Sequence, residues 1–168
     1  MLSVVLFGTQ ACFRRETDYP WGFTEQQRDS FSAEVVRVWG GLAFASSFAP
    51  GGDDQFAGRW AAYQRAGASR AAAAELNCMN LSIDVRPLLR EIRVPTLGVN
   101  RRGDPIGPPE AGNYIAEHVE GARLVELDGR DHILWLRDSE ALCAEIERLV
   151  LNVEAGLSTR KVSGTSGS

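Results

Sequence analysis

The chain has 168 residues, enough for one domain that buries a hydrophobic core. Its 44% hydrophobic and 24% charged residues are typical of a globular protein, and its net charge of -4 argues against nucleic acid or an anionic membrane as a partner. The three cysteines are widely spaced and match no metal-binding pattern, so we expect buried free thiols in a cytoplasmic protein. We expect no metal or other cofactor, and a small molecule as substrate or ligand.

A short apolar segment at residues 2–7, followed by Gly8, predicts a β-strand. Its β-branched residues are typical of a strand buried on both faces of a parallel sheet. The segment is too short for the apolar core of a signal peptide or for a membrane span, and no basic region precedes it. Residues 1–19 are therefore expected to form a first sheet strand and the loop that follows it.

The sequence pattern becomes helical between about residues 20 and 92. Thr24 with Gln27 three residues later resembles a capping box, which predicts a helix that ends near Trp39, before two glycines. A helix after Asp53 or Asp54 is expected to carry one aromatic stripe, which favours core packing over a cofactor site: Phe56, Trp60 and Tyr63.

Two further helices are expected before residue 92. The alanine-rich segment that begins at Ser69 has high intrinsic helix propensity. The segment 84–90 is predicted to form a short helix with Pro87 in its first turn, where the missing N–H costs no hydrogen bond.

Strands and helices alternate strictly between residues 93 and 155. We expect a strand, a helix, a strand and a helix, at 95–100, 109–119, 122–127 and 138–153. Strands joined by helices of this length pair in parallel through right-handed crossovers, so both loops after the strands lie at the same edge of the sheet. Residues 156–168 are rich in Gly, Ser and Thr and are expected to form a flexible tail or linker.

Each of these two loops contains a residue suited to proton transfer. Asp104 follows the strand 95–100 within Gly-Asp-Pro, and His132 follows the strand 122–127. Taken alone, Asp104 is explained as a turn residue that hydrogen-bonds its own backbone, and a single loop histidine is explained as incidental. Together they predict a carboxylate beside an imidazole, where it fixes the ring tautomer and stabilises the imidazolium.

Two other side chains are alternatives for the members of this pair. Asp131 is an alternative carboxylate, but side chains of directly adjacent residues rarely point to the same place. His118 lies near the end of a predicted helix between acidic residues, where we expect it to face solvent and to interact favourably with the helix C-terminus.

Four segments in this order resemble the C-terminal half of an α/β-hydrolase. They are Val94-Pro95-Thr96-Leu97, the loop Gly103 to Glu110, the strand Gly121 to Leu127, and the turn Gly129-Arg130-Asp131-His132. An acid followed by a histidine is the chain order of the last two members of the triad in that fold. Val4 to Thr9 followed by Asp18-Tyr19-Pro20-Trp21-Gly22 is similar to a narrower group, the hydrolase domains fused to adenylate or guanylate cyclases.

The resemblance implies a partial α/β-hydrolase fold: a parallel sheet of about three strands with a helical cap inserted at residues 20–92. It implies Asp104 as the triad acid and His132 as the triad base in a hydrolase of esters or related compounds. Aromatic side chains of the cap would supply an apolar substrate pocket, chiefly Trp21, Phe23, Trp39 and Trp60.

The serine nucleophile of that family is not found. No serine of the chain lies in the frame G-x-S-x-G, and the nearest approach, around Ser166, lies in the tail rather than after a strand. Without a nucleophile and an oxyanion hole, the acid and the histidine have no group to activate, so the chain alone is expected to be inactive.

The missing segment also has a structural consequence. The strand at residues 2–7 is expected to be a bare sheet edge that pairs with a missing N-terminal half or with another copy of the chain. The alternative function is a non-catalytic module that retains the cap pocket for ligand sensing or assembly, in association with a nucleotide cyclase.

Overall fold

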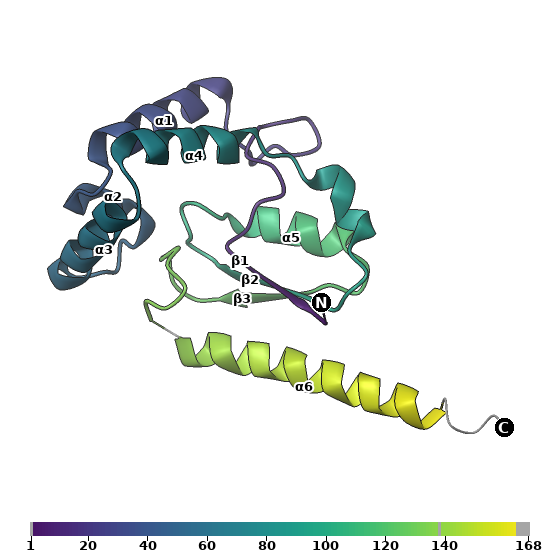
Figure 1. The fold of residues 1–168 in the computed structure, drawn as a ribbon. Coiled ribbons are helices and arrows are strands. Elements are labelled where there is room, and N and C mark those ends of the chain that lie inside the picture. Colours follow the sequence, from purple (N-terminus) through teal and green to yellow (C-terminus); the bar gives the residue numbers. More distant parts are fainter. Residues whose placement is uncertain (1, 138, 164–168) are drawn as a thin grey trace.

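The computed structural model describes residues 2–137 and 139–163, which form a three-layered core with a group of helices beyond one end of its sheet (Figure 1). The sheet has three parallel strands in the order β1-β2-β3, with bounds Val4–Phe7, Thr96–Arg101 and Arg123–Leu127. Helix α5 (Pro109–His118) covers one face and helix α6 (Ser139–Ser163) lies along the other. The parallel pairing of three strands and the edge position of β1 agree with the sequence-based prediction.

Two apolar clusters hold the sheet between these helices. On the α6 side, Leu97 and Val99 of β2 pack against Leu142 and Leu149. On the α5 side, Ile115 and Val119 pack against Tyr19, which is fully buried. Every residue of β2 is buried, as expected for the central strand of a sheet covered on both faces.

Strand β1 is less buried than predicted. In this strand Val5 is 37% exposed, and the other three residues are of intermediate burial. The physical reason is its position: within the described residues β1 pairs with β2 on one side only, so its other edge has no neighbouring strand. An edge strand of this kind presents unpaired backbone N–H and C=O groups.

The cap contains four helices, α1 to α4, which lie beyond the carboxyl ends of the strands (Figure 1). Their bounds are Glu25–Val38, Leu42–Phe48, Asp54–Gly67 and Arg70–Ser82. The predicted capping box of α1 is present, Asp53 accepts from the N–H of Phe56 at 2.7 Å, and Ser69 caps α4. The short helix α2 was not predicted, because the two glycines before it indicated an end rather than a new start.

Three other features differ from the predictions. The segment expected to be a short helix is a 3-10 helix, Arg86–Glu91. Helix α6 continues to Ser163, so residues 156–163 are helical rather than a linker, while 164–168 lie outside the described residues. Cys78 and Cys143 are exposed, and only Cys12 is a buried thiol.

None of the helices in the described part combines the length and apolar character needed to cross a bilayer.

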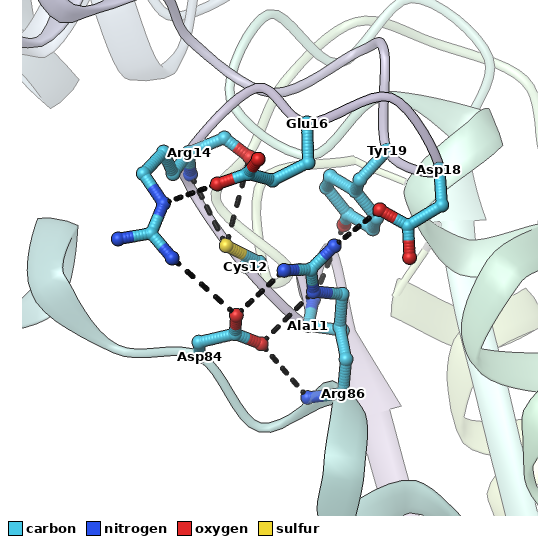
Figure 2. Close-up of polar contacts among 8 residues, drawn as sticks. All are labelled: Ala11, Cys12, Arg14, Glu16, Asp18, Tyr19, Asp84 and Arg86. Carbon is cyan, nitrogen blue, oxygen red and sulfur yellow. Dashed lines mark hydrogen bonds and ion pairs between the residues drawn. The ribbon is translucent and has the colours of Figure 1, made fainter.

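The two chain segments that connect the cap to the sheet lie side by side (Figure 2). The N–H of Val85 donates to the carbonyl of Ala11 at 2.8 Å, and Cys12 and Asp84 form an antiparallel bridge. Around this junction five charged side chains form what we call the cap-base cluster, namely Arg14, Glu16, Asp18, Asp84 and Arg86.

Arg86 is the centre of the cap-base cluster. Its guanidinium donates to both carboxylate oxygens of Asp84, at 3.0 and 2.7 Å, and to Asp18 at 2.8 Å, and it lies over the ring of Tyr19. The hydrogen bonds from Arg86 hold the pKa of the Asp84 carboxyl below its usual value, and burial raises the pKa of Tyr19. The cluster thus fixes the base of the cap with paired charges.

Candidate active site

The structure brings Asp104 and His132 together at the ends of two neighbouring strands. Asp104 follows β2, His132 follows β3, and the parallel register, with Arg101 opposite Leu127, places both loops at one edge of the sheet. The distance from His132 Nδ1 to Asp104 Oδ2 is 2.8 Å. The carboxylate side chain is fully buried and the imidazole is 23% exposed, so the pair is reachable from the histidine side.

The backbone of its own loop orients the Asp104 carboxylate. Oδ1 accepts hydrogen bonds from the N–H groups of Ile106 and Gly107, at 2.8 and 3.0 Å. The turn and the contact with the histidine are therefore compatible: the turn uses one oxygen of Asp104 and leaves Oδ2 for the imidazole. A neutral imidazole that donates from Nδ1 to an ionised carboxylate leaves Nε2 as an acceptor.

Gly8, at the end of β1, packs directly against this pair. Its φ is +55°, and a Cβ added there would lie 2.9 Å from His132 Cε1 and 3.0 Å from Asp104 Oδ2. Any side chain would have to displace the imidazole or the carboxylate. The sequence analysis used Gly8 only as the end of a strand, and nothing in the sequence indicated its contact with the pair.

The loop that carries His132 is also attached to the cap. The backbone N–H of His132 donates to the carbonyl of Phe48 at 2.7 Å. Asp131, the alternative carboxylate, accepts from the N–H of Gly51 at 2.7 Å, and Arg137 donates to the carbonyl of Gly51 at 2.8 Å. The carboxylate of Asp131 therefore binds the α2–α3 connection, and Asp104 holds the imidazole.

A cavity of about 480 Å³ lies between the cap helices and His132. Trp39 and Trp60 line it, together with Phe48 and His132. Apart from His132, its lining side chains carry no ionisable acid or base other than the phenol of Tyr63. Within the wall, Gln64 Oε1 and Trp60 Nε1 are buried and make no hydrogen bond within the described residues. The cavity suits a neutral ligand that is largely apolar.

The other two aromatic residues predicted for the pocket lie elsewhere. Trp21 packs in the core, with its ring 4.7 Å from that of Tyr19 and 5.9 Å from that of Tyr114. Phe23 contacts Phe31 and borders a shallow groove on the outside of α1. Neither residue lines the cavity next to His132.

The aromatic stripe on α3 has a different position from the one predicted. The rings of Phe56, Trp60 and Tyr63 stack in sequence, with centroid separations of 6.2 and 5.5 Å. Tyr63 is 68% exposed, so the stripe is not a core element. It forms part of the cavity wall instead, through Trp60 and Tyr63.

No family model matches the chain, but parts of it are similar in sequence to known esterases. A pimeloyl-[acyl-carrier protein] methyl ester esterase of Neisseria meningitidis serogroup C is 41% identical over 61 residues, 36% of this chain and 24% of the relative. The Nitrosomonas europaea protein of the same name is 28% identical over 132 residues, 73% of this chain and 51% of the relative. A rhodomycin D methylesterase of a Streptomyces species is 36% identical over 58 residues, 34% of this chain and 20% of the relative.

Solved structures match most of the chain. An esterase of Exiguobacterium antarcticum superposes with a TM-score of 0.75 and 22% identity, covering 90% of this chain and 57% of the esterase. A bromoperoxidase of Bacillus anthracis gives a TM-score of 0.75 with 21% identity, covering 89% of this chain and 58% of the bromoperoxidase. The chain spans about half the length of these structures, and half or less of the curated relatives.

The parallel sheet with its flanking helices, and its match to these structures, show that the chain has part of the α/β-hydrolase fold. The named relatives are esterases, and none of them is described as fused to a cyclase. The narrower resemblance to cyclase-linked hydrolase domains stays a prediction.

Proposed function

We propose that this chain supplies the acid, the base and the substrate pocket of a serine-type hydrolase that acts on esters of a small alcohol. The observation that carries the proposal is the 2.8 Å contact between His132 Nδ1 and Asp104 Oδ2 beside an apolar cavity. A carboxylate that holds the ring through Nδ1 leaves Nε2 to take a proton from an attacking hydroxyl.

The cavity supports an ester whose acid portion is bulky and uncharged. Its volume of about 480 Å³ lies in the range of small-molecule sites, and its wall is largely aromatic and aliphatic. The relatives named above are methyl ester esterases, whose alcohol is the smallest possible. We therefore assign the cap cavity to the acid portion, through Trp39 and Trp60 rather than Trp21 and Phe23.

The attacking serine comes, in this proposal, from outside the 168 residues. No serine of the chain has the G-x-S-x-G frame, and the free edge of β1 offers backbone groups to one more parallel strand. A strand that pairs there and then turns would bring its end next to Gly8, which contacts the Asp104–His132 pair. A second copy of the chain is the competing occupant of this edge.

The chemistry follows from these positions. The serine oxygen bonds to the ester carbonyl carbon while its proton passes to His132 Nε2, and Asp104 stabilises the imidazolium. When the bond to the alcohol oxygen breaks, the same proton passes to the leaving alcohol, and water repeats the sequence to release the acid.

A chimaera tests the proposal. In the Nitrosomonas europaea esterase, the region equivalent to residues 2–163 of this chain is replaced by those residues, and the methyl ester of a medium-length carboxylic acid is supplied as substrate. We expect hydrolysis by this esterase chimaera, and a loss of about a thousandfold or more in kcat with His132→Ala. Hydrolysis that survives His132→Ala contradicts the assignment of the base.

Binding to the chain alone tests the pocket separately. Trp39 and Trp60 line the cavity, so the fluorescence of the chain is expected to change when a neutral methyl ester with an apolar acid portion is added. The corresponding free carboxylate should bind more weakly, because the cavity offers no cation other than a protonated His132. Equal binding of both compounds contradicts the proposed substrate class.

A further inference from the structure

We propose that Arg101 is a positioning residue for His132: a buried guanidinium that fixes the backbone on both sides of the histidine. This inference rests on the proposed function, because it concerns the same base. It is tested on the state of the His132 ring, so its failure can be distinguished from a failure to hydrolyse esters.

The guanidinium of Arg101 makes four hydrogen bonds to one loop. Nη1 donates to the carbonyls of Asp131 and Ile133, at 2.7 and 2.9 Å, which are the residues directly before and after the histidine. Nη2 donates to the carbonyls of Leu134 and Arg137, at 3.3 and 2.8 Å. A single side chain at the end of β2 therefore binds the backbone on both sides of His132.

The environment of Arg101 explains why the loop has to keep this shape. Its side chain is only 1% exposed, and none of the ion pairs found in the described part of the chain includes it. A buried charge without a carboxylate is tolerated only when other polar groups compensate it, and here the carbonyl dipoles of the His132 loop do so. If the loop moved away from Arg101, the buried guanidinium would lose its hydrogen-bond acceptors. The free-energy cost of that loss favours the observed position of the loop.

Two local features support this fit. Arg137 has a φ of +68°, which is unfavourable for a residue with a side chain, and its carbonyl accepts one of the bonds from Arg101. Gly129, with a φ of +111°, leaves room beside the arginine, because a Cβ there would lie 3.3 Å from Arg101 Cδ. The loop conformation and the arginine are thus mutually adapted.

The planar fork of arginine is needed for four carbonyls at once. Lysine keeps the charge but has one nitrogen, which cannot reach acceptors spread over residues 131 to 137. Arg101→Lys should therefore preserve the charge and loosen the histidine, which separates the geometric role from a purely electrostatic one.

The experiment follows the ring of His132 by NMR in the full chain. In the unaltered protein we expect a protected Nδ1–H held by Asp104, and in Arg101→Lys an increase of about tenfold or more in its exchange rate with solvent. Arg102→Lys is the matched control, because the neighbouring Arg102 is exposed and contacts Asp128. The control should leave the ring unchanged, and His118 serves as an internal reference in every spectrum.

A folded Arg101→Lys variant with the same Nδ1–H exchange as the unaltered protein overturns the proposal. Since the variant can fail to fold, a second measurement uses the unaltered chain. Four carbonyl bonds predict separate, slowly exchanging Nη1 and Nη2 signals for Arg101, whereas one averaged guanidinium signal overturns the proposal without any substitution.

Discussion

The carboxylate of Asp104 is fully buried and that of Asp84 is partly buried, and the two have different kinds of partners. Asp84 in the cap-base cluster accepts hydrogen bonds from Nε and Nη2 of Arg86 and has Arg14 nearby, so its charge is matched by guanidinium groups (Figure 2). Asp104 receives two backbone N–H groups on one oxygen and the His132 ring on the other.

The comparison shows how its partners suit a carboxylate either to a structural role or to the proposed catalytic one. A guanidinium that binds both oxygens occupies the carboxylate and stabilises the chain around it. Asp104 has no such partner in the described structure, and Arg101, the last residue of the strand before it, binds carbonyls instead. In the proposed mechanism, the negative charge of Asp104 is thereby available to the imidazolium that forms during proton transfer.

The largest expected effect is on catalysis. Asp104→Asn in the esterase chimaera should lower kcat by about a thousandfold or more, because an amide no longer holds Nδ1–H in the required tautomer. Asp84→Asn should change kcat only a few fold. Ester hydrolysis rates of the two variants decide this, and equal losses would break the distinction between the two carboxylates.

The next effect comes from the space beside the pair. Gly8→Ala should reduce kcat of the chimaera by about a hundredfold, because the new Cβ displaces the imidazole or the carboxylate and small displacements of reacting groups are costly. Gly58→Ala on α3 is the control, since a Cβ there meets nothing within 4 Å. Unchanged activity in Gly8→Ala would mean that the pair tolerates movement.

The sequence predicted the strands, most helices and the Asp104–His132 pair because each depends on local patterns or on chain order. The alternation of strand and helix segments along the chain locates the strands, and caps such as Thr24 and Asp53 mark where helices start. Parallel crossovers bring successive strand ends together. The features of the site that it missed depend on contacts between residues distant in sequence.

Arg101 illustrates the difference. In the sequence it is one of two adjacent arginines before Gly103, and only the fold shows that one is buried and the other exposed. The same limit applies to Trp21 and Trp60: both are cap tryptophans, but one packs in the core and the other lines the cavity. Composition and spacing do not distinguish them.

The next prediction concerns the effect of Arg86 on the free energy of unfolding. Arg86→Met should lower the free energy of unfolding by about 2 kcal/mol, since its side chain is only 15% exposed and its loss leaves Asp84 with Arg14 alone, at 3.8 Å. Arg93→Met is the control: Arg93 and Glu120 form an exposed pair at 3.4 Å, for which about 0.5 kcal/mol is expected. Urea unfolding of both variants measures the difference, and equal shifts would remove the structural role of the cluster.

The smallest effect is a pH dependence of the same cluster. The hydrogen bonds from Arg86 lower the pKa of Asp84 in the folded protein relative to an unfolded value of about 3.9. A carboxylate with a lowered folded pKa contributes stability that is fully present above the unfolded pKa and is lost as pH falls through the folded pKa.

The unfolding free energies of the unaltered chain and Asp84→Asn should therefore differ by about 1 kcal/mol between pH 5 and 7, and the difference should shrink below pH 4. Asp18→Asn removes a single exposed contact with Arg86, so its effect should be smaller throughout. A difference for Asp84→Asn that stays constant down to pH 3 would mean that shape, and not charge, holds the base of the cap. In that case the difference between Asp84 and Asp104 would no longer be explained by the partner that binds each carboxylate.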